Sequence, residues 1–152
     1  MVSPAFIVSL ICSLLLSGIS WYNSVATLPL LPLISEEKRA EAANTLKRRS
    51  TLLHLPLVSL ELLTSFATLV FSVRSMAASE QSARFIQLYG ISFFILFGIW
   101  GISLGILRKQ RLAFWNNPTE KHYTAMYLTS ILRAALWTVR SLFIVLSVAT
   151  KT

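Results

Sequence analysis

The sequence predicts an all-α integral membrane protein, a single four-helix bundle with up-down-up-down topology. Hydrophobic residues make up 55% of the 152-residue chain and charged residues only 13%, and the mean hydropathy is +0.65. In a soluble domain about a quarter of the residues would be charged. The apolar residues gather into four runs, each near the ~20 residues that a helix needs to cross a bilayer. Short connections between the runs favour antiparallel neighbours.

The four predicted spans take up most of the chain and leave no room for a soluble domain. They cover about 5–28, 52–73, 85–107 and 124–149. The first run lacks the basic start of a signal peptide, so we expect it to be a retained span. Pro29 and Pro32 are expected to end it, and Pro56 is expected to kink the second span. Residues 36–49 contain good helix formers and are expected to form a short amphipathic helix that leads into the second span.

Basic residues are distributed unequally between the connections. Five lie in residues 35–50 and four in residues 108–123, whereas the other side has three, Arg74, Arg84 and Lys151. Connections rich in Lys and Arg normally stay in the cytoplasm. Both basic connections are therefore predicted to be cytoplasmic, with the termini across the membrane. The net charge of +8 then indicates attraction to anionic lipid headgroups, and nothing in its distribution indicates nucleic-acid binding.

The second and fourth spans carry charged residues in their interiors, Glu61 in one and Arg133 and Arg140 in the other. A charge in the hydrocarbon region costs at least ~2.5–3.5 kcal/mol on insertion scales, so such residues normally face the bundle interior or a wet cavity. His54 shares a helix face with Glu61, and Arg133 shares one with Arg140, because seven residues make nearly two turns. Counting from the predicted span starts places Glu61 and Arg133 at one depth, about 13–14 Å. We therefore expect these two to pair and Arg140 to have no acidic partner.

These residues define a candidate site. An unpaired arginine that faces a cavity suits an anion or an oxyanion, and His54, close to the cytoplasmic surface, is placed to relay protons to Glu61. Residues late in the first span add a polar donor and aromatic walls at a comparable depth. The candidate catalytic residues are Glu61, His54, Arg140 and Arg133, and the candidate substrate-binding residues are Trp21, Tyr22, Asn23 and Trp137.

No metal or cofactor site is predicted. The two histidines, His54 and His122, lie in different segments, and neither has further ligands at metal-binding spacing. The chain also lacks the glycine-rich motifs that hold nucleotide cofactors.

Two interpretations of the polar residues stay open. In the structural one the ion pair locks two helices, Arg140 extends to the interface, and the chain is a scaffold or accessory subunit with a packed interior. In the functional one a connected internal cavity touches Glu61, Arg140 and Tyr22. Gly101 and Gly105 form a GxxxG pattern that allows a helix to approach closely, either within the bundle or from a homo-oligomer or another membrane protein.

Two stretches of the chain resemble the anthrone-oxygenase-like family of membrane proteins. The first span ends in SGISWYNSVATLP (residues 17–29), and the last contains LRAALWTVRSL (residues 132–142). Members of that family have a glycine-containing first span that ends near a proline, and a Trp-x-x-x-Arg-like segment in the final span. Here Trp137 and Arg140 have one fewer intervening residue. The resemblance covers the layout of the whole chain and the residues of these two stretches.

The resemblance implies oxidation of an anthrone or a similar polyketide by molecular oxygen, without metal or flavin. Glu61 or His54 would then remove a proton from the substrate carbon. Arg140 or Arg133 would hold the resulting enolate, and the aromatic candidates would flank the polycycle. Partners would be membrane lipids and this hydrophobic small molecule.

Overall fold

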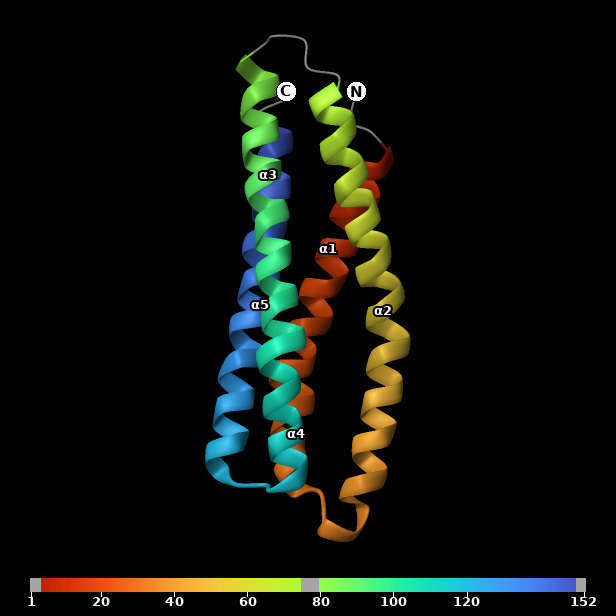
Figure 1. Ribbon diagram of the computed structural model, residues 1–152, viewed down its shortest axis with the longest axis vertical. Helices are drawn as coiled ribbons and strands as arrows, with labels where there is room; N and C mark the ends of the chain where they lie inside the picture. The colour runs from red at the N-terminus through yellow and green to blue at the C-terminus, as the bar shows by residue number, and fades with distance from the viewer. Residues whose placement is uncertain (1–3, 75–79, 150–152) are drawn as a thin grey trace.

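The computed structural model describes residues 4–74 and 80–149 and forms an all-α four-helix bundle (Figure 1). Lys151, counted above among the basic residues, lies outside these ranges. The described elements are α1 (Pro4–Tyr22), η1 (Asn23–Thr27), η2 (Leu28–Leu33), α2 (Glu36–Arg74), α3 (Glu80–Gly101), η3 (Ile102–Leu107), α4 (Arg108–Asn116) and α5 (Glu120–Ala149).

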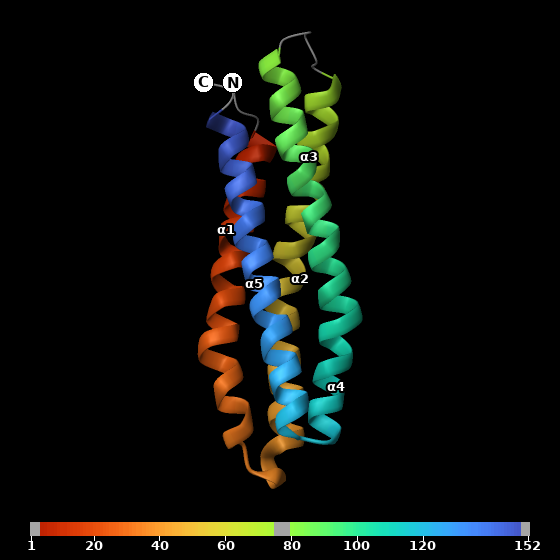
Figure 2. The same ribbon diagram turned by 90° about the vertical axis from the view of Figure 1, so that its left-hand side faces the viewer.

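The helices alternate in direction, so the bundle has the predicted up-down-up-down topology (Figures 1 and 2). The helix α1 packs against α2 and α5, and α3 packs against α5 and less closely against α2. This order places α2 and α5 on opposite corners of the bundle, as it does α1 and α3. Because α2 and α5 also run in the same direction, side chains that meet between them do so across the core.

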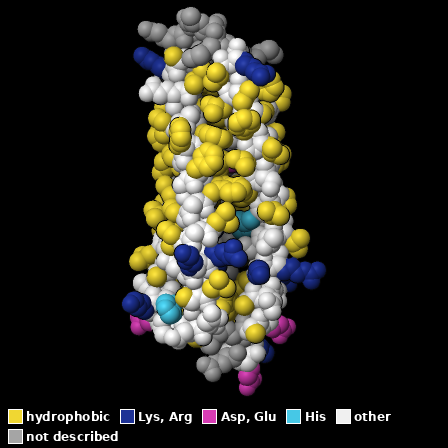
Figure 3. Space-filling view, viewed as in Figure 1, with side chains coloured by type: hydrophobic (Ala, Val, Ile, Leu, Met, Phe, Trp, Pro, Cys, Tyr) yellow, Lys and Arg dark blue, Asp and Glu magenta, His cyan; other side chains and the backbone are white. Residues whose placement is uncertain are grey.

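Four helical stretches are long and apolar enough to cross a membrane, and the four predicted spans lie inside them. They are Pro4–Leu33, Ala40–Arg74, Ala83–Asn116 and Glu120–Ala149. Figure 3 shows hydrophobic side chains over most of one face, with most Lys and Arg side chains gathered towards the end that holds the α1–α2 and α4–α5 connections. We call this the basic end of the bundle. The start of α1 and the end of α5 lie at the other end.

The ends of the helices differ from the prediction after the first and third spans, and the predicted amphipathic helix is present before the second. The first span does not end at its prolines, because the chain continues through the wide turns of η1 and the tight turns of η2, which holds Pro29 and Pro32. Pro29 is tolerated because the first turn of a helix needs no backbone N–H donor. The helix α2 starts at Glu36 and runs through Pro56 in 39 residues, so the predicted amphipathic helix is its first part. The connection after α3 is itself mostly helical, as η3 and α4.

A stripe of serines forms the contact between α1 and α5. Five buried serines lie along one face of α1 and its continuation η1, at spacings of three or four residues: Ser9, Ser13, Ser17, Ser20 and Ser24. Three of them bond across to α5, with oxygen–oxygen distances of 2.9 Å for Ser13–Ser141, 3.0 Å for Ser17–Thr138 and 3.0 Å for Ser24–Ser130. Small polar residues allow helices to approach closely and hydrogen-bond where lipid supplies no partner.

Each of these hydroxyl contacts is expected to contribute little on its own. Ser13→Ala and Ser17→Ala should each lower the free energy of unfolding in detergent by about 0.6 kcal/mol, the average for such bonds in membrane bundles. Ser59→Ala, at an exposed position of α2, is the matched control and should change nothing measurable. Equal effects at the three positions would show that the hydroxyls do not couple α1 to α5.

The GxxxG pattern of the third helix does not serve packing inside the bundle. Gly98, Gly101 and Gly105 are exposed, and a Cβ added at any of them would meet no atom within 4 Å. Their spacing of three and four residues places them on one outward face. We call these three residues the glycine face.

Candidate functional site

A buried ion pair lies at the centre of the bundle, between Glu61 of α2 and Arg140 of α5. Both side chains have no exposed surface. The Arg140 Nε donates to Glu61 Oε1 at 3.0 Å, and Nη2 donates to the same oxygen. The predicted pair between Glu61 and Arg133 is therefore wrong, and so is the expectation that Arg140 has no acidic partner. We call Glu61 and Arg140 the closed pair.

Further hydrogen bonds satisfy the remaining donors of Arg140. Its Nη1 donates to the carbonyl oxygen of Ser92 and, at 3.1 Å, to the Ser92 hydroxyl. Its Nη2 also donates to Ser65 Oγ at 2.8 Å, and Ser65 donates in turn to Glu61 Oε1 at 3.1 Å. A buried charge needs both an opposite charge and hydrogen bonds to its other polar atoms, and this arginine has both.

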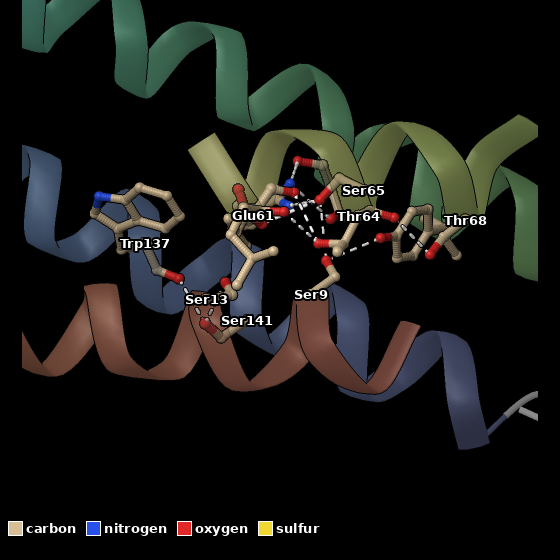
Figure 4. A network of polar contacts seen from close by, with 12 residues as sticks. Ser9, Ser13, Glu61, Thr64, Ser65, Thr68, Trp137 and Ser141 are labelled. Carbon is tan, nitrogen blue, oxygen red and sulfur yellow. Dashed lines mark hydrogen bonds and ion pairs between the residues drawn. The ribbon is translucent and has the colours of Figure 1, made fainter. Parts of the chain in front are cut away.

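The network extends from the closed pair to all four helices. Ser9 of α1 lies 3.0 Å from the Ser65 hydroxyl and 3.0 Å from the Tyr89 hydroxyl of α3. Figure 4 shows Ser9, Glu61 and Ser65 turned towards one another between the helices. Glu61 Oε2 alone has no hydrogen-bond partner in this network. The arrangement therefore fixes the relative positions of the helices and leaves little of the pair free for chemistry.

His54 and Arg133 lie at the same relative register as the closed pair, one heptad towards the basic end. The residue numbers differ by 79 in both pairs, and α2 and α5 run in the same direction. Seven residues of helix separate the pairs, or about 10.5 Å. No hydrogen bond joins His54 to Glu61, since His54 Nε2 and Glu61 Oε2 have no partner, and the proton relay between them stays a prediction.

This second pair has polar atoms without partners, so we call it the open pair. Arg133 is only 8% exposed, yet its Nε and Nη2 have no hydrogen-bond acceptor. His54 is half-buried; its Nδ1 lies 3.0 Å from the carbonyl oxygen of Ser50, and its Nε2 has no partner. A carbonyl only accepts, so the contact with Ser50 is a hydrogen bond in the tautomer that carries the proton on Nδ1; in that neutral ring Nε2 holds the free lone pair.

An apolar cluster with two indoles lies one turn from the open pair. Leu57 and Val58 of α2, Trp100 of α3, and Leu136 and Trp137 of α5 belong to it. Trp137 is 3% exposed. The Nε1 of Trp100 is buried without a hydrogen-bond partner. The flat faces of two indoles therefore lie about one helical turn from the free donors of Arg133 and the free Nε2 of His54.

The structure does not bring the other predicted substrate-binding residues to either pair. Trp21 lies at the contact with α5, where its Nε1 donates to Thr138 Oγ1 at 2.9 Å. Tyr22 is 67% exposed and faces away from the bundle. Asn23 accepts a long hydrogen bond, 3.5 Å, from Thr27 one turn later. Of the four, only Trp137 lies close to predicted catalytic residues.

A pocket of about 260 Å³ lies at the basic end, away from both pairs. It is lined by Leu31, Pro32, Phe114, Pro118, Thr119, Glu120 and Tyr123. The cavity expected of the functional interpretation would touch Glu61, Arg140 and Tyr22, and none of these residues lines this pocket. Within residues 4–74 and 80–149, no three His, Cys, Asp or Glu side chains gather in a way that could hold a metal ion.

No family model, curated protein or solved structure matches the chain. The resemblance to the anthrone-oxygenase-like family therefore remains an expectation, and the functional argument depends on the geometry.

The residues that complete the closed pair, Ser65 and Ser92, were not predicted from the sequence. Ser65 and Ser92 give no signal of their own, because an isolated serine in a span is common. The serine stripe of the first helix was visible, since its regular spacing predicts one small polar face. Ser65 is four residues from Glu61, so a hydrogen bond between their side chains is also expected on a helix.

Proposed function

We propose that the chain is a multi-pass membrane protein that oxidises a hydrophobic polycyclic, anthrone-like substrate with molecular oxygen and without a cofactor. The open pair would supply its catalytic groups. The observation that carries this assignment is the set of unused polar atoms in that pair: two buried donors of Arg133 and the free Nε2 of His54. The closed pair leaves one atom, Glu61 Oε2, without a partner, because all the donors of Arg140 are used.

The chemistry follows from these atoms. His54 Nε2 takes a proton from the activated carbon of the substrate, and Arg133 stabilises the enolate oxygen through its two free donors. The enolate gives one electron to oxygen, and recombination forms a carbon–oxygen bond. The peroxide takes back the proton from His54 and then loses water. Overall, a CH₂ group and O₂ become a C=O group and H₂O.

The surroundings suit such a substrate. The indoles of Trp100 and Trp137 belong to the cluster next to the open pair and offer flat apolar surfaces. Oxygen dissolves in the hydrocarbon region, where the enolate would meet it. We place the basic end in the cytoplasm, following the bias of Lys and Arg.

Oxygen consumption tests the proposal. The chain, reconstituted in lipid vesicles, is given an anthrone, and oxygen uptake is followed together with quinone formation. We expect one oxygen consumed for each quinone formed, at a rate above the spontaneous oxidation in empty vesicles. Rates that equal the background across several polycyclic substrates would contradict the oxygenase.

A second candidate is a non-catalytic scaffold or accessory subunit, favoured by two observations. The closed pair and the serine stripe tie the helices together without a ligand. The glycine face is left unused by the bundle and is open to a helix of a second copy or of another membrane protein.

The glycine face gives the scaffold its own prediction. Gly101→Leu with Gly105→Leu should abolish chemical crosslinking between copies, or with a partner, because the larger side chains keep a second helix away. Gly18→Leu, at another position with no neighbour within 4 Å, is the control. Crosslinking that survives the double substitution would show that the glycine face is not the contact surface of the assembly.

A further inference from the structure

We propose that Arg111 and Arg133 bind one phosphate group between them, the phosphate of an anionic membrane lipid. This inference does not depend on the oxygenase. A phosphate held at Arg133 would occupy the donors that the oxygenase proposal assigns to the enolate, so the two ligands exclude each other at this residue. Its starting point is a guanidinium that is nine-tenths buried and has unused donors. Arg133 is 8% exposed, and both its Nε and its Nη2 are buried without an acceptor.

A second positive charge lies close to the first. Arg111 is half-buried on α4, and α4 packs against α5, the helix that carries Arg133. Two cations held near each other in a partly desolvated place repel, and the repulsion strengthens as the surroundings become less polar. An anion bound between the two guanidinium groups would attract both of them and offset their repulsion.

Among the acidic residues whose side chains the structure describes, none supplies that anion. Glu61 is committed to Arg140, and Glu37, Glu41 and Glu120 are exposed. The free donors of Arg133 therefore call for an acceptor from outside the chain.

The directions of the two helices bring the guanidinium groups together. Helical side chains lean towards the N-terminus of their helix. Because α4 runs towards the basic end, the side chain of Arg111 leans into the bundle. Because α5 starts at the basic end, the side chain of Arg133 leans back towards it (Figure 1). The two arginine side chains therefore lean towards the same level of the bundle, where lipid headgroups meet the apolar part of the helices.

Phosphate suits this geometry better than other abundant anions. Guanidinium groups bind phosphate oxygens through paired, charge-assisted hydrogen bonds. Basic pockets between helices on the cytoplasmic side are a recurring form of anionic-lipid recognition. A free phosphate ion offers the same oxygens, so the test must separate the two sources.

The test uses the full chain, purified in detergent and depleted of lipid, with bound phosphatidylglycerol counted by native mass spectrometry. Inorganic phosphate and phosphatidylcholine are titrated in parallel arms. We expect one phosphatidylglycerol to bind saturably, with Arg133→Gln weakening it by about tenfold or more and Arg111→Gln by about fivefold. Arg108→Gln is the matched control, since it removes an exposed basic residue from the helix that carries Arg111; it should leave the affinity unchanged.

Each outcome decides the proposal. Saturable binding that is lost in the Arg111 and Arg133 variants but retained in the Arg108 variant supports it. Arg111→Gln keeps the inference testable even if Arg133→Gln does not fold. Displacement of the lipid by inorganic phosphate at similar concentrations would assign the site to soluble phosphate and overturn the lipid source. Equal lipid binding by the parent and all three variants would overturn the site itself.

Discussion

Arg140→Gln is expected to destabilise the bundle by about 3–5 kcal/mol, the largest effect that we predict for any single substitution. The substitution leaves the Glu61 carboxylate without its partner, at a position with no exposed surface. It also removes the donors that reach Ser65 and Ser92, so the loss extends to three helices. Denaturant unfolding in detergent micelles, followed by circular dichroism, measures the change.

Two further variants serve as controls for this prediction. Glu61→Gln combined with Arg140→Gln should recover much of the loss, because the double variant buries no unpaired charge. Arg133→Gln should cost far less, since it removes a guanidinium whose donors Nε and Nη2 are unused. A double variant as unstable as Arg140→Gln would mean that the ion pair is not the source of the effect.

Arg133→Gln is expected to lower the rate of anthrone oxidation by roughly 10²-fold, the scale seen when one oxyanion donor is lost. Folding should persist, so the loss would appear in the rate and not in the amount of inserted protein. Oxygen uptake in reconstituted vesicles, corrected for the spontaneous rate, measures it. His54→Ala should act at the proton-transfer step, and the exchange of substrate deuterium with solvent should slow with it.

Arg108→Gln supplies the matched control for activity, because it removes an exposed basic residue and touches neither pair. A fall in rate as large as that of Arg133→Gln would point to general charge effects at the basic end. An unchanged rate in both Arg133→Gln and His54→Ala would exclude the open pair as the catalytic site.

The helix faces were predictable from the sequence, but their register was not. Periodicity alone placed His54 with Glu61 and Arg133 with Arg140, as the structure has them. A face that repeats every seven residues, however, allows two pairings that differ by one heptad. The predicted depths counted from sequence-derived span starts and chose Glu61 with Arg133. The true register is shifted by seven residues, about 10.5 Å. The residues taken as span starts, Leu52 and Thr124, do not lie at the same level of the bundle.

The hydrogen bonds that complete the closed pair also could not be predicted from the sequence. Charge and spacing can show that an arginine needs an acceptor, but Ser65 and Ser92 reach Arg140 only because the bundle places three helices around it. The same holds for the glycine face: the GxxxG spacing was visible, and only the packing order shows that it points outward.

The direct test of the two-pair arrangement is a double-mutant cycle on the free energy of unfolding, with Glu61→Gln combined in turn with Arg140→Gln and with Arg133→Gln. Residues in one buried network couple, whereas separated residues add. We expect a coupling energy of about 3 kcal/mol between Glu61 and Arg140, the upper end of measured cycles. Between Glu61 and Arg133 we expect no coupling beyond experimental error. Strong coupling of Glu61 to Arg133, with additivity at Arg140, would contradict both the register and the assignment of the open pair.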